Sequence, residues 1–137
     1  MAYVRGRYGV EYTPRNGMVQ SDAEAVKWYR KAAEQGHIEA QNRIGIMYRD
    51  GRGVAQDYTE AVKWFLKAAE QGNAEAQFNL AEAYYHGNGI DKDGDKAHAW
   101  FCKASRQGVA KADGFIKLLE SNQTSGLLRR SKRLKMP

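Results

Sequence analysis

Three histidines and one cysteine are the residues of this chain most able to support catalysis. Cys102 could act as a nucleophile if His86 lay beside it, because an imidazole can accept the thiol proton. His37, His86 and His98 belong to no His-Glu-x-x-His zinc motif, and no Gly-x-Ser-x-Gly nucleophile motif occurs. We therefore expect a protein that is not an enzyme and has no catalytic residue. Hydrolysis by Cys102 and His86 is the enzymatic alternative.

Two kinds of loop could bind ions or phosphate. Asp91-Lys-Asp93-Gly-Asp95 resembles the start of a calcium loop, but positions 6 and 12 of an EF-hand loop would be Lys96 and Cys102 instead of Gly and Glu. The Gly-x-Gly pairs at 51–53 and 87–89 lack the preceding strand and the Gly-Lys-Ser/Thr ending of phosphate-binding loops. We expect no metal and no cofactor, and assign Asp93 to the N-cap of a helix.

The elements that carry these residues belong to one folded unit. The chain has 137 residues, of which 42% are hydrophobic and 28% charged, and no apolar stretch approaches the roughly 18 residues of a membrane-spanning helix. The single Cys102 excludes an internal disulfide and a cysteine-rich zinc site. The first residues have no apolar core of a signal peptide, so we expect a cytoplasmic location.

The chain repeats itself with a period of 36 residues. The segment AVKWYRKAAEQG at 25–36 recurs as AVKWFLKAAEQG at 61–72 and as AHAWFCKASRQG at 97–108. A second set with the same period pairs Ala40 with Ala76 and Tyr48 with Tyr84. Such self-similarity is the signature of a repeat architecture, in which each unit packs only on its neighbours.

Each period predicts two helices. Residues 38–49 place Ala40, Ile44, Met47 and Tyr48 on one helical face, and residues 58–70 do the same with Ala61, Trp64, Phe65 and Ala68. Ser21-Asp-Ala-Glu24 and Asp57-Tyr-Thr-Glu60 have the form of capping boxes at helix starts. Glycine closes each unit at Gly36, Gly72 and Gly108. The expected fold is all-α, a right-handed α-α solenoid of antiparallel helix pairs without strands.

Two ladders of residues recur once per unit. We interpret Trp28, Trp64 and Trp100 as core residues, because they share a helix face with the small alanines. We interpret Lys31, Lys67 and Lys103 as a solvated face, partly neutralised by nearby glutamates.

This unit is similar to the Sel1-like repeat family, relatives of the tetratricopeptide repeats. The resemblance rests on Ala-x-x-Trp-x-x-Lys-Ala-Ala-Glu-Gln-Gly, followed by Ala-Gln-x-x-Ile/Leu and by Gly-x-Gly. It implies a solenoid over 1–120, with full units at 37–72 and 73–108, a first unit at 2–36 whose first helix is degenerate, and a capping helix at 109–120. It also implies an adaptor that binds proteins.

By analogy with the tetratricopeptide fold, the first helix of each unit lines a concave surface. Its outward positions vary between the units, which suits a specific binding surface. Apolar contact would come from Ile46, Phe78 and Tyr85, and hydrogen bonds from Asn42 and Arg49. The candidate binding residues are Glu39, Asn42, Ile46, Arg49, Asp50, Glu75, Phe78, Glu82, Tyr85 and His86.

The net charge of +6 lies mostly in the basic tail, residues 121–137. This tail contains no acidic residue, and its basic residues are Arg129, Arg130, Lys132, Arg133 and Lys135. The tail could bind nucleic acid or an anionic membrane, which is the alternative function, or it could dock as a short helix on an open solenoid end. It could equally have no binding role. Exposed solenoid ends also make self-association an open alternative.

Overall fold

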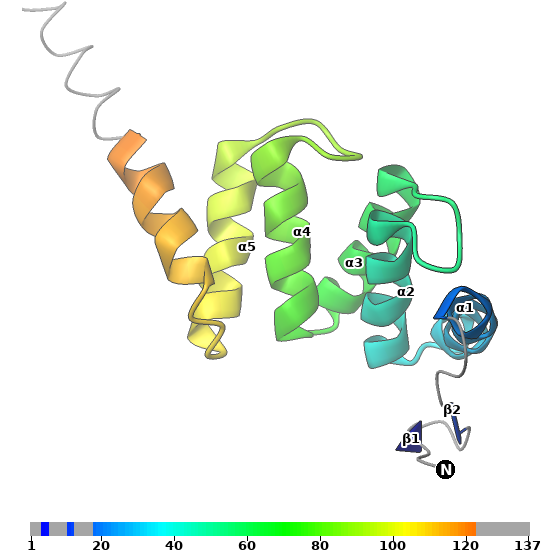
Figure 1. Ribbon diagram of the computed structural model, residues 1–137. Coiled ribbons are helices and arrows are strands. Elements are labelled where there is room, and N and C mark those ends of the chain that lie inside the picture. Colours follow the sequence, from blue (N-terminus) through cyan, green and yellow to red (C-terminus); the bar gives the residue numbers. More distant parts are fainter. Residues whose placement is uncertain (1–3, 6–10, 13–17, 123–137) are drawn as a thin grey trace, which may run out of the picture.

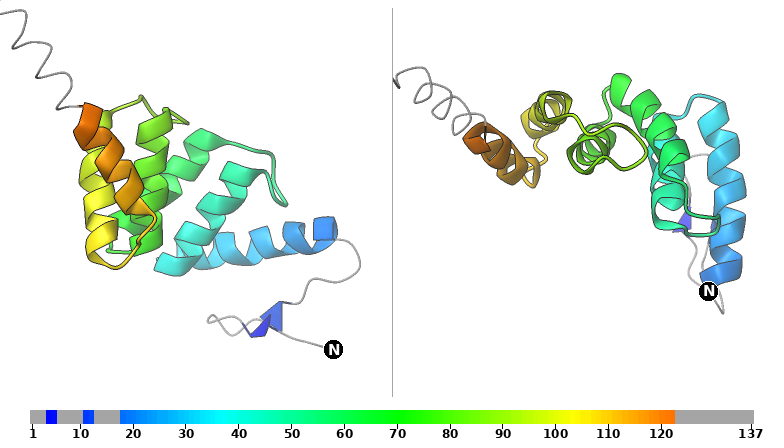
Figure 2. Two further views of the ribbon diagram at one scale, coloured as in Figure 1. Left: turned by 60° about the vertical axis from the view of Figure 1, so that its left-hand side comes forward. Right: turned by 90° about the horizontal axis from the view of Figure 1, so that it is seen from above.

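The computed structural model describes residues 4–5, 11–12 and 18–122. Its helices are α1 (Met18–Glu34), α2 (Ile38–Asp50), α3 (Tyr58–Glu70), α4 (Ala74–His86), α5 (Gly94–Arg106) and a further helix over residues 112–122. The helices follow one another in chain order from α1 at one end of the array to helix 112–122 at the other (Figure 1), and neighbouring helices pack together. Viewed from above, the row is curved (Figure 2). The predicted all-α solenoid is confirmed.

Local sequence signals set the helix boundaries of the two central units. The side chains of Asp57 and Asp93 accept hydrogen bonds from the backbone N–H groups of Glu60 and Lys96, each at 3.0 Å. Each aspartate therefore caps the N-terminus of its helix, as the sequence predicts. At the other end of α4, Gly87 adopts the left-handed conformation, with φ of 74°, and its N–H bonds back to the helix.

The N-terminal unit departs from the prediction. Helix α1 begins at Met18, so the expected start of the helix at Ser21 lies inside it. Where a degenerate helix was expected, the described residues form two short antiparallel strands, β1 (Val4–Arg5) and β2 (Glu11–Tyr12), with Val4 opposite Tyr12. The physical reason lies in the composition, because glycine and proline within 2–16 cost a helix about 1 and 3 kcal/mol each.

Small residues let the helices approach closely around a few large ones. Ile44, Phe65, Leu80 and Phe101 are the largest fully buried side chains. A methyl group added at Gly45 in α2 would lie only 2.7 Å from a ring carbon of Phe65 in α3. The two helices of a unit therefore cross at a point where only glycine leaves room for the aromatic ring.

The tryptophan ladder is only partly in the core. Trp64 is 8% exposed, as expected of a core residue, whereas Trp28 is 48% exposed, so its assignment to the core is wrong. Helices α1 and α2 precede Trp64 in the array, but no described helix precedes α1, which carries Trp28. The lysine ladder lies across these rings, with the ammonium of Lys67 4.7 Å from the ring centre of Trp64 and that of Lys103 4.3 Å from Trp100.

Buried glutamines join one unit to the next. The side chain of Gln41 donates to the backbone carbonyl of Ala33 in the preceding unit at 3.2 Å, and Gln77, 36 residues further on, donates to the carbonyl of Ala69 at 3.3 Å. Gly89 adds a backbone contact, because a methyl group there would lie 2.4 Å from the carbonyl of Tyr58. These contacts fix the angle between successive units and hence the shape of the space between them.

Candidate functional site

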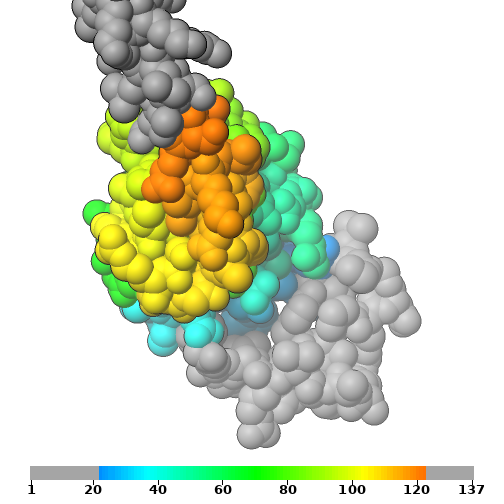
Figure 3. All heavy atoms as spheres, turned by 90° about the vertical axis from the view of Figure 1, so that its left-hand side faces the viewer, coloured from blue at the N-terminus to red at the C-terminus, as the bar shows by residue number. Residues whose placement is uncertain are grey.

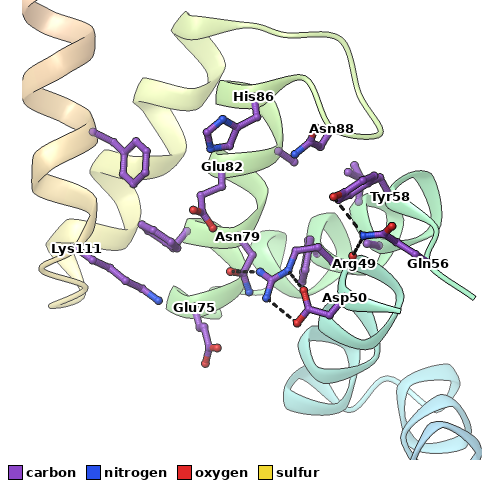
Figure 4. A pocket seen from close by; sticks show the side chains of 16 residues that line it. Arg49, Asp50, Gln56, Tyr58, Glu75, Asn79, Glu82, His86, Asn88 and Lys111 are labelled. Carbon is purple, nitrogen blue, oxygen red and sulfur yellow. Dashed lines mark hydrogen bonds and ion pairs between the residues drawn. The ribbon is translucent and has the colours of Figure 1, made fainter. Parts of the chain in front are cut away.

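An open cavity of about 810 Å³ lies between α2, α3, α4 and the start of helix 112–122 (Figure 4). Its walls combine charged, amide and aromatic side chains from both central units. The lining residues are Arg49, Asp50, Gln56, Tyr58, Ala61, Val62, Phe65, Glu75, Phe78, Asn79, Glu82, Ala83, His86, Asn88, Lys111 and Phe115.

Helix α4 supplies the longest wall of the cavity. Glu75, Phe78, Asn79, Glu82 and His86 all line it, and their spacing of three to four residues places them on one side of the helix. The contact of Gly89 with α3 and the hydrogen bonds from Gln77 to Ala69 and from Asn79 to Asn42 hold this side at a fixed distance from α2 and α3. The contacts between the two units therefore determine the width of the cavity.

The floor of the cavity is aromatic and closely packed. The ring of Phe78 packs edge-on against Phe101 and Phe115, with ring centres 5.5 and 5.9 Å apart. Phe101 and Phe115 are stacked, with centres 4.7 Å apart and planes within 5°. The ammonium of Lys111 lies 4.4 Å above the Phe78 ring. This cluster attaches helix 112–122 to the rest of the array and presents an apolar surface to the cavity.

Arg49 occupies the opposite wall and is held by two partners (Figure 4). Its guanidinium donates to both carboxylate oxygens of Asp50, at 2.8 and 3.2 Å, and to the side-chain oxygen of Asn79 at 3.3 Å. Asn79 in turn donates to the side-chain oxygen of Asn42 at 3.0 Å. A chain of polar contacts thus runs from the open cavity to a buried amide pair between α2 and α4.

The pKa of Arg49 is raised above its ordinary value. The hydrogen bond to Asp50 is the main cause, burial acts in the opposite direction, and the negative charges of Asp50, Glu82 and Glu75 raise the pKa further. Arg49 is therefore a permanent cation whose charge is already balanced by Asp50. The carboxylates of Glu75 and Glu82 form no hydrogen bond or ion pair within the part of the chain that the structure describes.

The structure brings together six of the ten predicted binding residues: Arg49, Asp50, Glu75, Phe78, Glu82 and His86. The other four are not part of the cavity lining. Glu39 is exposed, Ile46 is partly buried, Tyr85 packs on Phe115 with ring centres 5.1 Å apart, and Asn42 lies beneath Asn79.

Two of the predicted residues do not point outward as expected. Asn42 and Phe78, which occupy the same position in successive repeats, are only 5% and 4% exposed. This position faces the next unit, because Asn42 bonds to Asn79 of α4 and Phe78 packs on Phe115 of helix 112–122. The prediction that the side chain of Asn42 is available at an open surface is wrong, whereas the largely buried ring of Phe78 still lines the cavity.

Sequence reasoning missed ten of the sixteen residues that line the cavity, among them Asn79, Lys111 and Phe115. Lys111 lies 36 residues after Glu75, and Phe115 lies 36 residues after Asn79. The repeat period, continued beyond the predicted Glu75, could therefore have found Lys111 but not Phe115, whose counterpart Asn79 was itself missed. The basic tail residues Arg129 to Lys135 lie outside the described residues.

The cysteine has a different histidine neighbour from the one considered in the sequence. The sulfur of Cys102 lies 3.7 Å from Nε2 of His98, one helical turn away, and that nitrogen lies 3.1 Å from a carboxylate oxygen of Glu120. His86 instead lies against Tyr85, with ring centres 5.0 Å apart, so the pairing of Cys102 with His86 is wrong. Neither Cys102 nor His98 lines the cavity.

The comparison with protein families identifies the repeat. The Sel1 repeat model matches residues 5–37, 38–73 and 74–109, which together make up most of the chain. The chain belongs to the Sel1 repeat family. The matched units follow the helix pairs α2–α3 and α4–α5 of the structure.

Solved structures of Sel1 repeat proteins are similar to this chain. A Sel1 repeat protein from Oxalobacter formigenes is 38% identical over 70% of this chain and 40% of its own, with a TM-score of 0.67. The protein c5321, a protective antigen of uropathogenic Escherichia coli with this fold, is 36% identical over 86% of this chain and 26% of its own, with a TM-score of 0.76. This chain thus spans less than half of either relative.

A more distant structure supports the fold alone. Cysteine-rich protein B from Helicobacter pylori is 22% identical over 71% of this chain and 87% of its own, with a TM-score of 0.61. No curated protein matches this chain. Sel1 repeat proteins are generally protein-interaction modules without enzymatic activity. Within the described ranges, no helix is both long and apolar enough to cross a membrane.

Proposed function

We propose that this Sel1 repeat protein is an adaptor that binds a protein segment in the cavity between α2, α3 and α4. The observation that supports this proposal best is the composition of the cavity walls. Apolar side chains form the floor, while the carboxylates of Glu75 and Glu82, which form no hydrogen bond or ion pair with other described residues, and the amide of Asn79 lie beside it. A peptide needs both kinds of contact, because its side chains require apolar area and its backbone requires polar partners.

The size of the cavity also supports a peptide ligand. A volume of about 810 Å³ lies within the roughly 300–1,000 Å³ of protein pockets that hold a drug-sized ligand, which corresponds to a few residues of a peptide. The closely packed Phe78, Phe101 and Phe115 cluster means that binding does not require the floor to become ordered first. A preformed site keeps the entropy cost of binding low.

A charge-reversal variant tests the proposal. We would replace Glu75 and Glu82 by arginine and use the full chain as bait in affinity capture from the host lysate. A matched control replaces Glu34 and Glu70 by arginine, because these exposed glutamates change the net charge equally but lie outside the cavity. A protein captured by the wild type and the control, and lost with the cavity variant, supports the adaptor proposal.

The same experiment separates the cavity from the basic tail. Equal capture by all three baits would refute the cavity as the binding site. Capture that disappears when salt is raised, regardless of the variant, would favour the tail as an electrostatic binder of nucleic acid or membrane.

A further inference from the structure

The side chains that line the cavity carry more negative than positive charges. Its charged lining consists of Asp50, Glu75 and Glu82 against Arg49 and Lys111. Arg49 is already paired with Asp50, and the ammonium of Lys111 lies over the ring of Phe78. The carboxylates left for a ligand are those of Glu75 and Glu82, which lie seven residues apart, on the same side of α4.

An apolar path leads out of the cavity along helix 112–122, which lies at the surface of this end of the array (Figure 3). Phe115 lines the cavity, and Leu118, three residues further on, is 54% exposed. Residues three apart share a helix face, so the aromatic floor continues as an exposed aliphatic side chain. A ligand that fits this surface combines basic groups with branched aliphatic ones.

The sequence that follows helix 112–122 has this composition. Residues 127–135 read LLRRSKRLK, which contains three leucines and five basic residues and no acidic residue. The distance is also suitable for contact within one molecule. Residue 122 is seven residues beyond Phe115, or about 10 Å along the helix axis. The five residues from 122 to 127 span up to about 17 Å when extended.

We propose that residues 127–135 bind in this cavity of the same molecule, with their basic side chains on Glu75 and Glu82 and their leucines on Phe115 and Leu118. The proposal rests on the cavity being the protein-binding site. It makes the basic tail an internal competitor, which a protein partner has to displace. It also states the chemistry of that partner, a segment that presents arginine or lysine together with leucine.

Paramagnetic broadening in the full chain tests this contact. A nitroxide would be attached at Ser131→Cys in a Cys102→Ser background, and the backbone amide signals of the helices recorded by NMR. We expect the amides of α4 and of residues 115–118 to lose intensity, and those of α1 to keep it. The losses should persist when the labelled chain is diluted with unlabelled protein, because the contact lies within one molecule.

Two neutralising variants provide the controls. Glu75→Gln with Glu82→Gln should reduce the broadening of α4, because each exposed ion pair strengthens a contact by roughly 1.5- to 5-fold. Glu34→Gln with Glu70→Gln should leave it unchanged. All four glutamates are at least partly exposed, so thermal unfolding should be similar for both variants and the wild type.

Several results would overturn the proposal. The tail does not bind in the cavity if broadening is absent or is uniform over all helices. Broadening that Glu75→Gln with Glu82→Gln leaves unchanged would refute the contact as well. Broadening that disappears on dilution assigns the contact to a second copy. If the tail proves to lie elsewhere while the charge-reversed cavity still loses its captured protein, the proposed function stands without the internal competitor.

Discussion

Gly89 is the position where a single methyl group should change the spacing between two units. Its φ is +78°, and an added Cβ would lie 2.4 Å from the backbone carbonyl of Tyr58 at the start of α3. Gly72 is a matched control, because its φ is +95° and an added Cβ there meets nothing within 4 Å. Gly72→Ala measures the free-energy cost of placing alanine at a positive φ. Gly89→Ala measures that cost together with the cost of the clash between the new Cβ and the backbone of Tyr58.

The expected losses in the free energy of unfolding differ between the two variants. An alanine in the left-handed region costs about 1–2 kcal/mol, which is the whole expected loss for Gly72→Ala. A clash with backbone atoms adds about 1–3 kcal/mol, so Gly89→Ala should lose about 2–5 kcal/mol. Tyr58 and Asn88 line the cavity beside this contact, so Gly89→Ala should also weaken capture of a cavity ligand.

Urea denaturation followed by circular dichroism measures both losses. The comparison should show a clearly larger loss for Gly89→Ala than for Gly72→Ala. Equal losses would show that the contact between Gly89 and Tyr58 does not constrain the units, and would refute the argument that it fixes the cavity.

Three further stability predictions can be measured by the same method. Asp57→Ala should cost about 1 kcal/mol, because it removes the side-chain acceptor that caps α3. Phe78→Ala should cost about 3–5 kcal/mol because the ring is buried among other aromatics, whereas Glu82→Ala should stay within about 0.5 kcal/mol. Trp64→Ala should likewise cost about 3–5 kcal/mol, and Trp28→Ala clearly less, since Trp28 is half exposed. A Trp28 loss as large as that of Trp64 would contradict the burial argument.

The repeat allowed the two central units to be predicted closely. The helices expected at 38–49 and 58–70 are found at Ile38–Asp50 and Tyr58–Glu70. Their signals are local, since Asp57 caps the helix that it precedes and Gly87 ends the helix that it follows. Such signals depend on neighbours in sequence, which the sequence itself displays.

The parts that were predicted wrongly depend on neighbours in space. Trp28 has the same sequence surroundings as Trp64, but it lies at the end of the described array and is exposed. Asn42 and Phe78 have variable identities, which suggested an open surface, but this repeat position packs against the following unit. Position in the array decided the first case. The rotation of the helix about its axis decided the second, and a one-dimensional period does not define that rotation closely enough.

Site-specific photo-crosslinking tests most directly whether the cavity binds protein. A benzophenone amino acid would replace Glu82 on the cavity wall in one bait and exposed Glu70, outside the cavity, in another. Our account predicts that irradiation in the host lysate joins a protein partner to the chain at position 82 and not at position 70. Crosslinking of the same protein at position 70 alone, or equally at both positions, would contradict it.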